Sequence, residues 1–243
     1  MRSWPRPRPA ARVPVACSLL GVLLGLGAAA AAAYGRGVTA LVHLSMDDRL
    51  SRLVPRSFSF VPGDAHYDGV YFYAIARDPL ARGIAHKLID SAAYRYGHPG
   101  YGWLAWLASA GGRPGAIPYA LVLVSLLGLG VACAAASLLA LDFGMSPWWG
   151  LSIAVNPGCL FAVTVDTSET VGVALVLVAV LLWIRERWFW AGVVIAMGCF
   201  TKEPLLLVPF ALLMWEAVRL RGGRRPTRPA ARVGALASQA SHP

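Results

Sequence analysis

The chain has 243 residues, of which 57% are hydrophobic and only 14% are charged, whereas a soluble domain has about 45–50% apolar and about 25% charged residues. This composition excludes an ordinary soluble protein, and the apolar residues fall in runs of membrane-spanning length. The formal net charge of +10 comes largely from arginines that flank the first and last runs, where the positive-inside rule explains them better than nucleic-acid binding does. We therefore expect an all-α polytopic transmembrane helical bundle in the plasma membrane, without a nucleic-acid partner.

The first apolar run, at about 13–34, follows a short basic tail at 1–12. It could be mistaken for a secretion signal, but the apolar core of a signal has only about 7–15 residues. Because this run approaches the roughly 20 residues that span a bilayer, we favour an uncleaved anchor. The basic tail and the Pro- and Arg-rich segment 222–243, which we expect to be disordered, are both placed in the cytoplasm.

Five further apolar runs lie at about 116–141, 147–164, 168–184, 188–201 and 204–220. The third and fifth of the six runs are short for full spans, so we expect them to tilt or to end in a cavity. About six crossings make 13–221 one transmembrane domain and place 35–99 in a long first extracytoplasmic loop. The four cysteines lie inside apolar runs without ligand spacing, so we expect neither a disulfide nor a metal site from them.

The long loop contains the sequence YDGVYFYAIA at 67–76. At helical spacing its apolar residues and tyrosines form one face, which predicts a short helix lying in the membrane interface. Asp68 stands at the start of this helix, where the helix dipole stabilises a carboxylate. The later sequence WLAWLAS is too short to span, and we interpret it as re-entrant or interfacial.

Three charged clusters, at 64–79, 165–170 and 201–204, fall on the outer side of this threading, and charges at membrane depth are candidates for a functional site. In the first cluster Asp64 and Asp68 are four residues apart. Either carboxylate could take a proton from a sugar hydroxyl as a general base. The alternative is a solvated loop carboxylate or a helix N-cap.

In the second cluster Asp166 and Glu169 share a helix face. They could orient an acceptor, help to hold a metal or adjust the pKa of the base, or they could belong to the N-cap of the next helix, with Ser168 or Asp166 as the cap.

In the third cluster Lys202 could bind a phosphate as a point charge, with Glu203 partly neutralising it. The alternative is a snorkelling lysine beside a glutamate at a helix start. Arg77 and Arg95 are further candidate cations, each interpreted as a surface charge.

The order of these motifs resembles the multi-spanning GT-C class of glycosyltransferases, and especially bacterial relatives of the GPI-anchor second mannosyltransferase. The similar elements are YDGVYFYAIA (67–76) in the first outer loop, HPGYGWL (98–104), the segment with NP (156–157), Phe161 and TSE (167–169), and FTKE (200–203). The chain departs from the family in having Asp166 where relatives have an aromatic residue nearby, and in ending after about six runs.

The resemblance implies that a sugar such as mannose moves from a polyprenyl-phosphate donor to an unidentified extracytoplasmic glycan, lipid or protein acceptor. It makes Asp68 the base, with Asp64 as second choice, and gives the phosphate to Lys202, with Arg77 as second choice. Tyr67, Asp166, Glu169 and Glu203 are assigned to substrate binding. No cofactor is expected, and nothing in the spacing indicates a divalent metal. The rivals are a truncated or accessory non-catalytic membrane protein and, less favoured, a lipid or solute transporter.

Overall fold

The computed structural model describes residues 12–62 and 67–221, and within these ranges the regular structure is helical. The elements are α1 (Val13–Ala33), η2 (Val38–Val42), η3 (Arg49–Leu53), α2 (Gly69–Arg77), α3 (Ala85–Leu88), α4 (Ala92–Arg95), α5 (Gly100–Ala108), α6 (Ile117–Asp142), η4 (Pro147–Gly150), α7 (Leu151–Ala154), α8 (Pro157–Thr164), α9 (Glu169–Ile184), α10 (Trp188–Cys199), η5 (Glu203–Leu206) and α11 (Leu207–Arg221). The all-helical class predicted from the sequence is confirmed. Asp64 and nearly all of the two predicted cytoplasmic tails lie outside the described residues.

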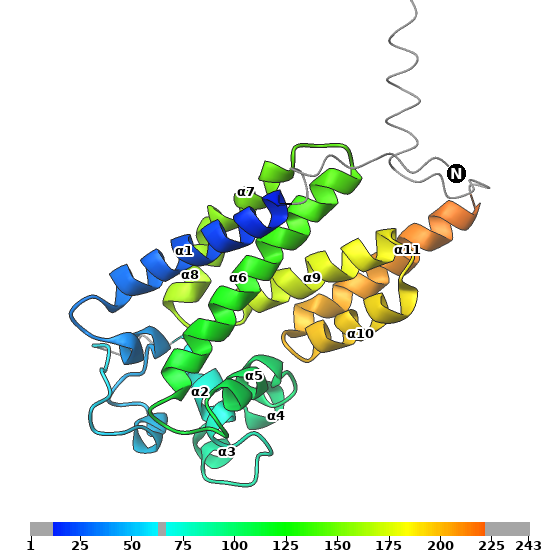
Figure 1. Ribbon diagram of the computed structural model, residues 1–243. Helices are drawn as coiled ribbons and strands as arrows, with labels where there is room; N and C mark the ends of the chain where they lie inside the picture. The colour runs from blue at the N-terminus through cyan, green and yellow to red at the C-terminus, as the bar shows by residue number, and fades with distance from the viewer. Residues whose placement is uncertain (1–11, 63–66, 222–243) are drawn as a thin grey trace, which may run out of the picture.

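Helix α6 runs through the middle of the molecule (Figure 1). Helices α1, α7 and α8 lie along one side of it, α9 to α11 lie toward the other, and α2 to α5 gather at one end. Two of the described helices, α1 and α6, are long and apolar enough to cross a membrane, with 21 and 26 residues and mean hydropathies of 2.2 and 2.4.

Helix α1 joins α6 through a face of small residues. Cys17, Gly21, Gly25 and Ala29 recur every four residues and are buried, and a Cβ atom added at Gly25 would lie 2.8 Å from side-chain carbons of Leu126 and Leu129. Small residues at this spacing let two apolar helices approach closely, as they do in membranes. The leucines on the opposite face of α1 stay exposed, so this helix both packs into the body and presents an apolar surface.

The other apolar runs form helices shorter than a span. The predicted run at 147–164 is broken into η4, α7 and α8, because Asn156 caps a new helix by accepting hydrogen bonds from the N–H groups of Gly158 and Cys159, and Pro157 occupies its first turn. Helices α9, α10 and α11 have 16, 12 and 15 residues. At about 1.5 Å per residue, α10 is only about 18 Å long, against a hydrocarbon core of about 30 Å.

Helix α2 corrects the expectation of an interfacial helix. Every residue from Val70 to Ala76 is at most 5% exposed, because α5, α6, η2 and α3 surround the helix. The sequence has apolar residues on all sides of the helix, which is the pattern of a core helix rather than an amphipathic one.

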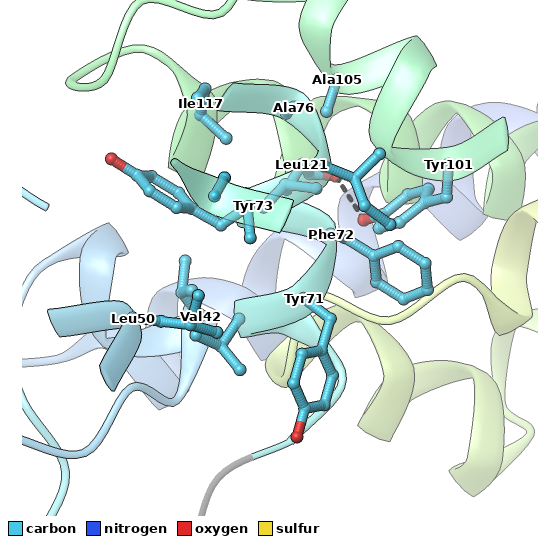
Figure 2. Packing of buried hydrophobic residues seen from close by; sticks show 14 of the residues in the cluster. Val42, Leu50, Tyr71, Phe72, Tyr73, Ala76, Tyr101, Ala105, Ile117 and Leu121 are labelled. Carbon is cyan, nitrogen blue, oxygen red and sulfur yellow. Dashed lines mark hydrogen bonds between the residues drawn. The ribbon is translucent and has the colours of Figure 1, made fainter. Parts of the chain in front are cut away.

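Helix α5, predicted to be re-entrant or interfacial, packs on α2 and α6 through one face and leaves Trp103 and Leu107 exposed, so its location at the interface stays a prediction. Figure 2 shows its Tyr101 ring beside Phe72, with the hydroxyl donating to the Leu121 carbonyl at 2.8 Å. The part of the long loop that forms α2 is therefore packed inside the protein.

Candidate functional site

The three charged clusters predicted from the sequence meet at the end of the molecule where α2 to α5 gather. We call their meeting point the ionic cluster. Its members are Asp68, Asp90, Tyr94, Arg95, His98, Glu169, Lys202 and Glu203. Four different parts of the chain supply them: the start of α2, the segment around α4, the start of α9 and the turn after α10.

Arg95 is the centre of the first half of the cluster. Its Nη1 donates to Asp68 Oδ1 at 2.9 Å and its Nε to Asp90 Oδ1 at 3.4 Å. The guanidinium carbon lies 3.6 Å from the centre of the Tyr71 ring and 5.5 Å from that of Tyr94. The Arg95 side chain is only 18% exposed, so the interpretation of Arg95 as a surface charge is wrong.

Asp68 occupies the N-cap position of α2, but its side chain makes no capping hydrogen bond. The carboxylate is directed to Arg95 instead, and it remains 41% exposed. A carboxylate held by a cation and open to solvent at once fits a site group better than a helix cap.

Glu203 ties the second half of the cluster together. Its Oε1 accepts a hydrogen bond from the Tyr94 hydroxyl at 2.5 Å, and its Oε2 lies 3.5 Å from His98 Nδ1. Burial lowers the pKa of His98, against the opposing effect of Glu203. The Tyr94 and His98 rings meet edge to face at 4.9 Å, so Glu203 links the turn after α10 to the segment around α4.

Lys202 pairs with Glu169 through Nζ and Oε1. The lysine side chain is 29% exposed and that of Glu169 is 41% exposed, so solvent screening keeps the contribution of this pair to stability small, at about 0–1 kcal/mol. The pair nevertheless joins the second and third sequence clusters.

Two glycines allow the backbone to bring these parts together. A Cβ atom at Gly69 would lie 2.6 Å from the Val165 carbonyl oxygen, and one at Gly100 would lie 2.8 Å from the Phe200 carbonyl oxygen. The Gly100 N–H donates to that Phe200 oxygen at 2.6 Å. Any side chain at either position would force α2 away from the start of α9, or α5 away from the end of α10.

Asp166 lies next to the cluster but not in it. Its side chain is fully buried, both carboxylate oxygens lack a hydrogen-bond partner, and its φ of 50° is left-handed. Burial raises the pKa of this carboxyl well above its ordinary value. An enclosed group cannot touch a substrate in this conformation, so the structure does not support the predicted acceptor-binding role. Ser168 occupies the N-cap position of α9, as the alternative predicted, but its side chain makes no capping hydrogen bond.

Asp166→Asn is expected to stabilise the protein more at pH 8 than at pH 4, relative to the parent chain. When folding raises the pKa of an acid, the protein loses stability as the pH rises from the pKa of that group in the unfolded state toward its pKa in the folded state. In this window only the folded state keeps the proton. The amide has no such dependence, so the difference should grow by up to about 1.4 kcal/mol per pH unit in that window. Thermal unfolding in detergent across this pH range measures it, and a constant difference would contradict the assignment.

Of the remaining predicted site residues, Tyr67 lies beside the ionic cluster and Arg77 lies away from it. Tyr67 lies at the start of α2 with its ring edge to face against His43 at 5.4 Å and Phe161 at 5.5 Å, which places it beside Asp68. Arg77 lies at the other end of α2, where its Nη1 donates to the Gly112 carbonyl at 3.0 Å. The structure therefore does not bring Arg77 to Lys202, and the predicted reserve role in phosphate binding is not supported. Asp64 lies outside the described residues.

Segment 90–98 contributes more to the ionic cluster than its sequence predicted. It supplies Asp90, Tyr94, Arg95 and His98, and the available signal was its density of polar and aromatic residues just before the HPGYG element. Within residues 12–62 and 67–221, no three His, Cys, Asp or Glu side chains are grouped so that they could hold a metal ion. All four cysteines carry free thiols.

No protein-family model matches the chain, and no curated protein or solved structure is detectably similar to it.

Proposed function

We propose that the chain is a multi-pass membrane glycosyltransferase of the GT-C type that transfers a sugar such as mannose from a polyprenyl-phosphate donor to an acceptor outside the cytoplasm. One observation carries the proposal. Three charged segments separated by apolar helices converge into one partly exposed cluster, and this cluster contains Asp68 at the position that the family resemblance assigns to the base.

The proposed topology has about six membrane-crossing segments, with both termini in the cytoplasm and the ionic cluster on the outer side. It is supported by the ion pairs that join the segment from α2 to α5 to the start of α9 and the turn after α10. The shorter helices α9 to α11 would cross with the help of flanking residues, local bilayer thinning or tilted packing partners.

In the proposed reaction, the Asp68 carboxylate removes the proton from an acceptor hydroxyl. The acceptor oxygen forms a bond to the anomeric carbon of the donor sugar with inversion. The bond from that carbon to the phosphate oxygen breaks, and its electron pair leaves with the polyprenyl phosphate. Cations near the leaving phosphate stabilise the separating charge, and Arg95 and Lys202 are the two permanent cations of the ionic cluster.

The test is sugar transfer by the purified intact chain in membranes. Polyprenyl-phosphate mannose and polyprenyl-phosphate glucose, each labelled in the sugar, are supplied with a range of glycan, lipid and peptide acceptors. The expected result is label in an acceptor product, with loss of label from the donor and none in membranes lacking the chain. A well-folded chain that transfers neither sugar would overturn the proposal in favour of a truncated or accessory membrane protein.

A transporter is the second alternative. It requires one site that opens to both sides of the membrane in turn, with ionisable groups along the route. Cysteine accessibility labelling at the ionic cluster would separate the two, because an enzyme of this layout exposes the cluster to the outer side alone.

A further inference from the structure

Arg95 and Asp68 create a conflict for the proposed function. The base must meet the acceptor hydroxyl, yet Asp68 Oδ1 accepts the Arg95 Nη1–H at 2.9 Å, so the cation holds one of the two carboxylate oxygens and competes with the acceptor proton for its negative charge. The leaving phosphate needs a cation, yet Lys202 is paired with Glu169 and Arg95 is paired with both Asp68 and Asp90. In the described cluster both permanent cations are therefore occupied by carboxylates.

The way in which Arg95 is held resolves this conflict. The guanidinium lies over the face of Tyr71 at 3.6 Å, so stacking fixes the position of the group through its face. Its five N–H donors point outward along the edge and remain able to change partners in the plane. Arginine also binds phosphate through two parallel hydrogen bonds, a geometry that a lysine cannot supply.

Asp68 holds the end of the Arg95 guanidinium with which a phosphate can pair. Its side chain is 41% exposed, against 18% for Arg95, so an incoming anion can reach the edge that Asp68 occupies. Asp90, although 58% exposed, bonds Nε at 3.4 Å, whereas Asp68 occupies Nη1, one of the two end nitrogens that can bind a phosphate through parallel hydrogen bonds. An anion that replaces Asp68 at Nη1 would leave the stacked group in place.

We propose that Arg95 recognises the donor phosphate by exchanging Asp68 for it, so that binding of the lipid phosphate releases the base. This inference rests on the proposed function for its meaning in catalysis, but the exchange itself is a binding equilibrium. Asp68 and the phosphate compete for one cation, so removing the charge of Asp68 must strengthen phosphate binding. An ion pair that only supports the fold predicts no such gain.

The test measures binding of a polyprenyl phosphate, and of the matching uncharged polyprenol, to the full chain in detergent by the change in tryptophan fluorescence. Asp68→Asn is expected to bind the phosphate several-fold more tightly than the parent chain and to bind the alcohol equally. Arg95→Gln is expected to bind the phosphate at least about tenfold more weakly, since it loses a charge-assisted pair of hydrogen bonds. Arg95→Lys, which keeps the charge but loses the planar edge, should bind the phosphate more weakly than the parent chain and more tightly than Arg95→Gln.

Asp142→Asn is the matched control, because Asp142 Oδ2 accepts from Arg185 Nε at 2.8 Å at the other end of α6. It should leave phosphate binding unchanged. Unchanged or weaker phosphate binding by folded Asp68→Asn overturns the exchange, even if Arg95→Gln fails to fold. The proposed function fails separately, through absence of sugar transfer in the parent chain, and tight phosphate binding without transfer would leave the exchange standing.

Discussion

Replacing Asp68 by Asn is expected to lower sugar transfer by at least about 10²-fold while the protein still folds and inserts. A general base contributes roughly 10²–10⁴-fold to a reaction rate, and the amide cannot accept the acceptor proton. The change keeps the size of the side chain, and Asp68 makes no capping bond to α2, so the helix loses no backbone partner. Initial rates from labelled polyprenyl-phosphate sugar measure the effect.

The control for this substitution is Asp142→Asn. Both aspartates pair with an arginine, at 2.9 Å for Asp68 and 2.8 Å for Asp142, but Asp142 ends α6 far from the ionic cluster (Figure 1). It should keep near-normal transfer. Near-normal turnover by Asp68→Asn would remove Asp68 as the base and leave Asp64 as the remaining candidate from the sequence.

The parts of the fold that the sequence predicted well are those that composition and length determine. Helix α1 matches the run at 13–34 and α6 the run at 116–141, because uninterrupted apolar residues leave the backbone no partners but its own. The prediction of one continuous span at 147–164 was wrong, because one Asn-Pro pair outweighs the apolar residues around it. Asn156 satisfies the first N–H groups of a new helix, which makes a break at that point favourable.

The site was only partly predictable, because its key contacts lie between segments distant in sequence. Asp68, Glu169, Lys202 and Glu203 could be found from their positions between apolar runs, whereas Asp90 was not predicted. Arg95 was a candidate cation, but its burial could not be predicted, since it depends on stacking against Tyr71, 24 residues earlier in the chain. The burial of Asp166 could not be predicted either, because no spacing in the sequence shows that a carboxylate will be enclosed without a hydrogen-bond partner.

Gly102→Ala is expected to destabilise the protein by about 1–3 kcal/mol, the usual cost of overpacking a core. A Cβ atom at Gly102 would lie 2.5 Å from Ile75 Cγ2 and 2.7 Å from Ile75 Cβ. Ile75 is 1% exposed and β-branched, so it has no room and few rotamers with which to yield. Helices α2 and α5 must therefore separate, and thermal unfolding in detergent should show a fall of about 2–4 °C for each kcal/mol.

Gly27→Ala, the same substitution in α1, should instead stabilise the protein. Nothing lies within 4 Å of a Cβ atom at Gly27, and alanine is favoured over glycine inside a helix by about 0.5–1 kcal/mol. Because α2 carries Asp68 and α5 begins at the Gly100 contact with Phe200, Gly102→Ala should also slow transfer at temperatures where it remains folded, whereas Gly27→Ala should not. If Gly102→Ala unfolds and transfers sugar like the parent chain, the close contact between α2 and α5 does not hold the ionic cluster in place.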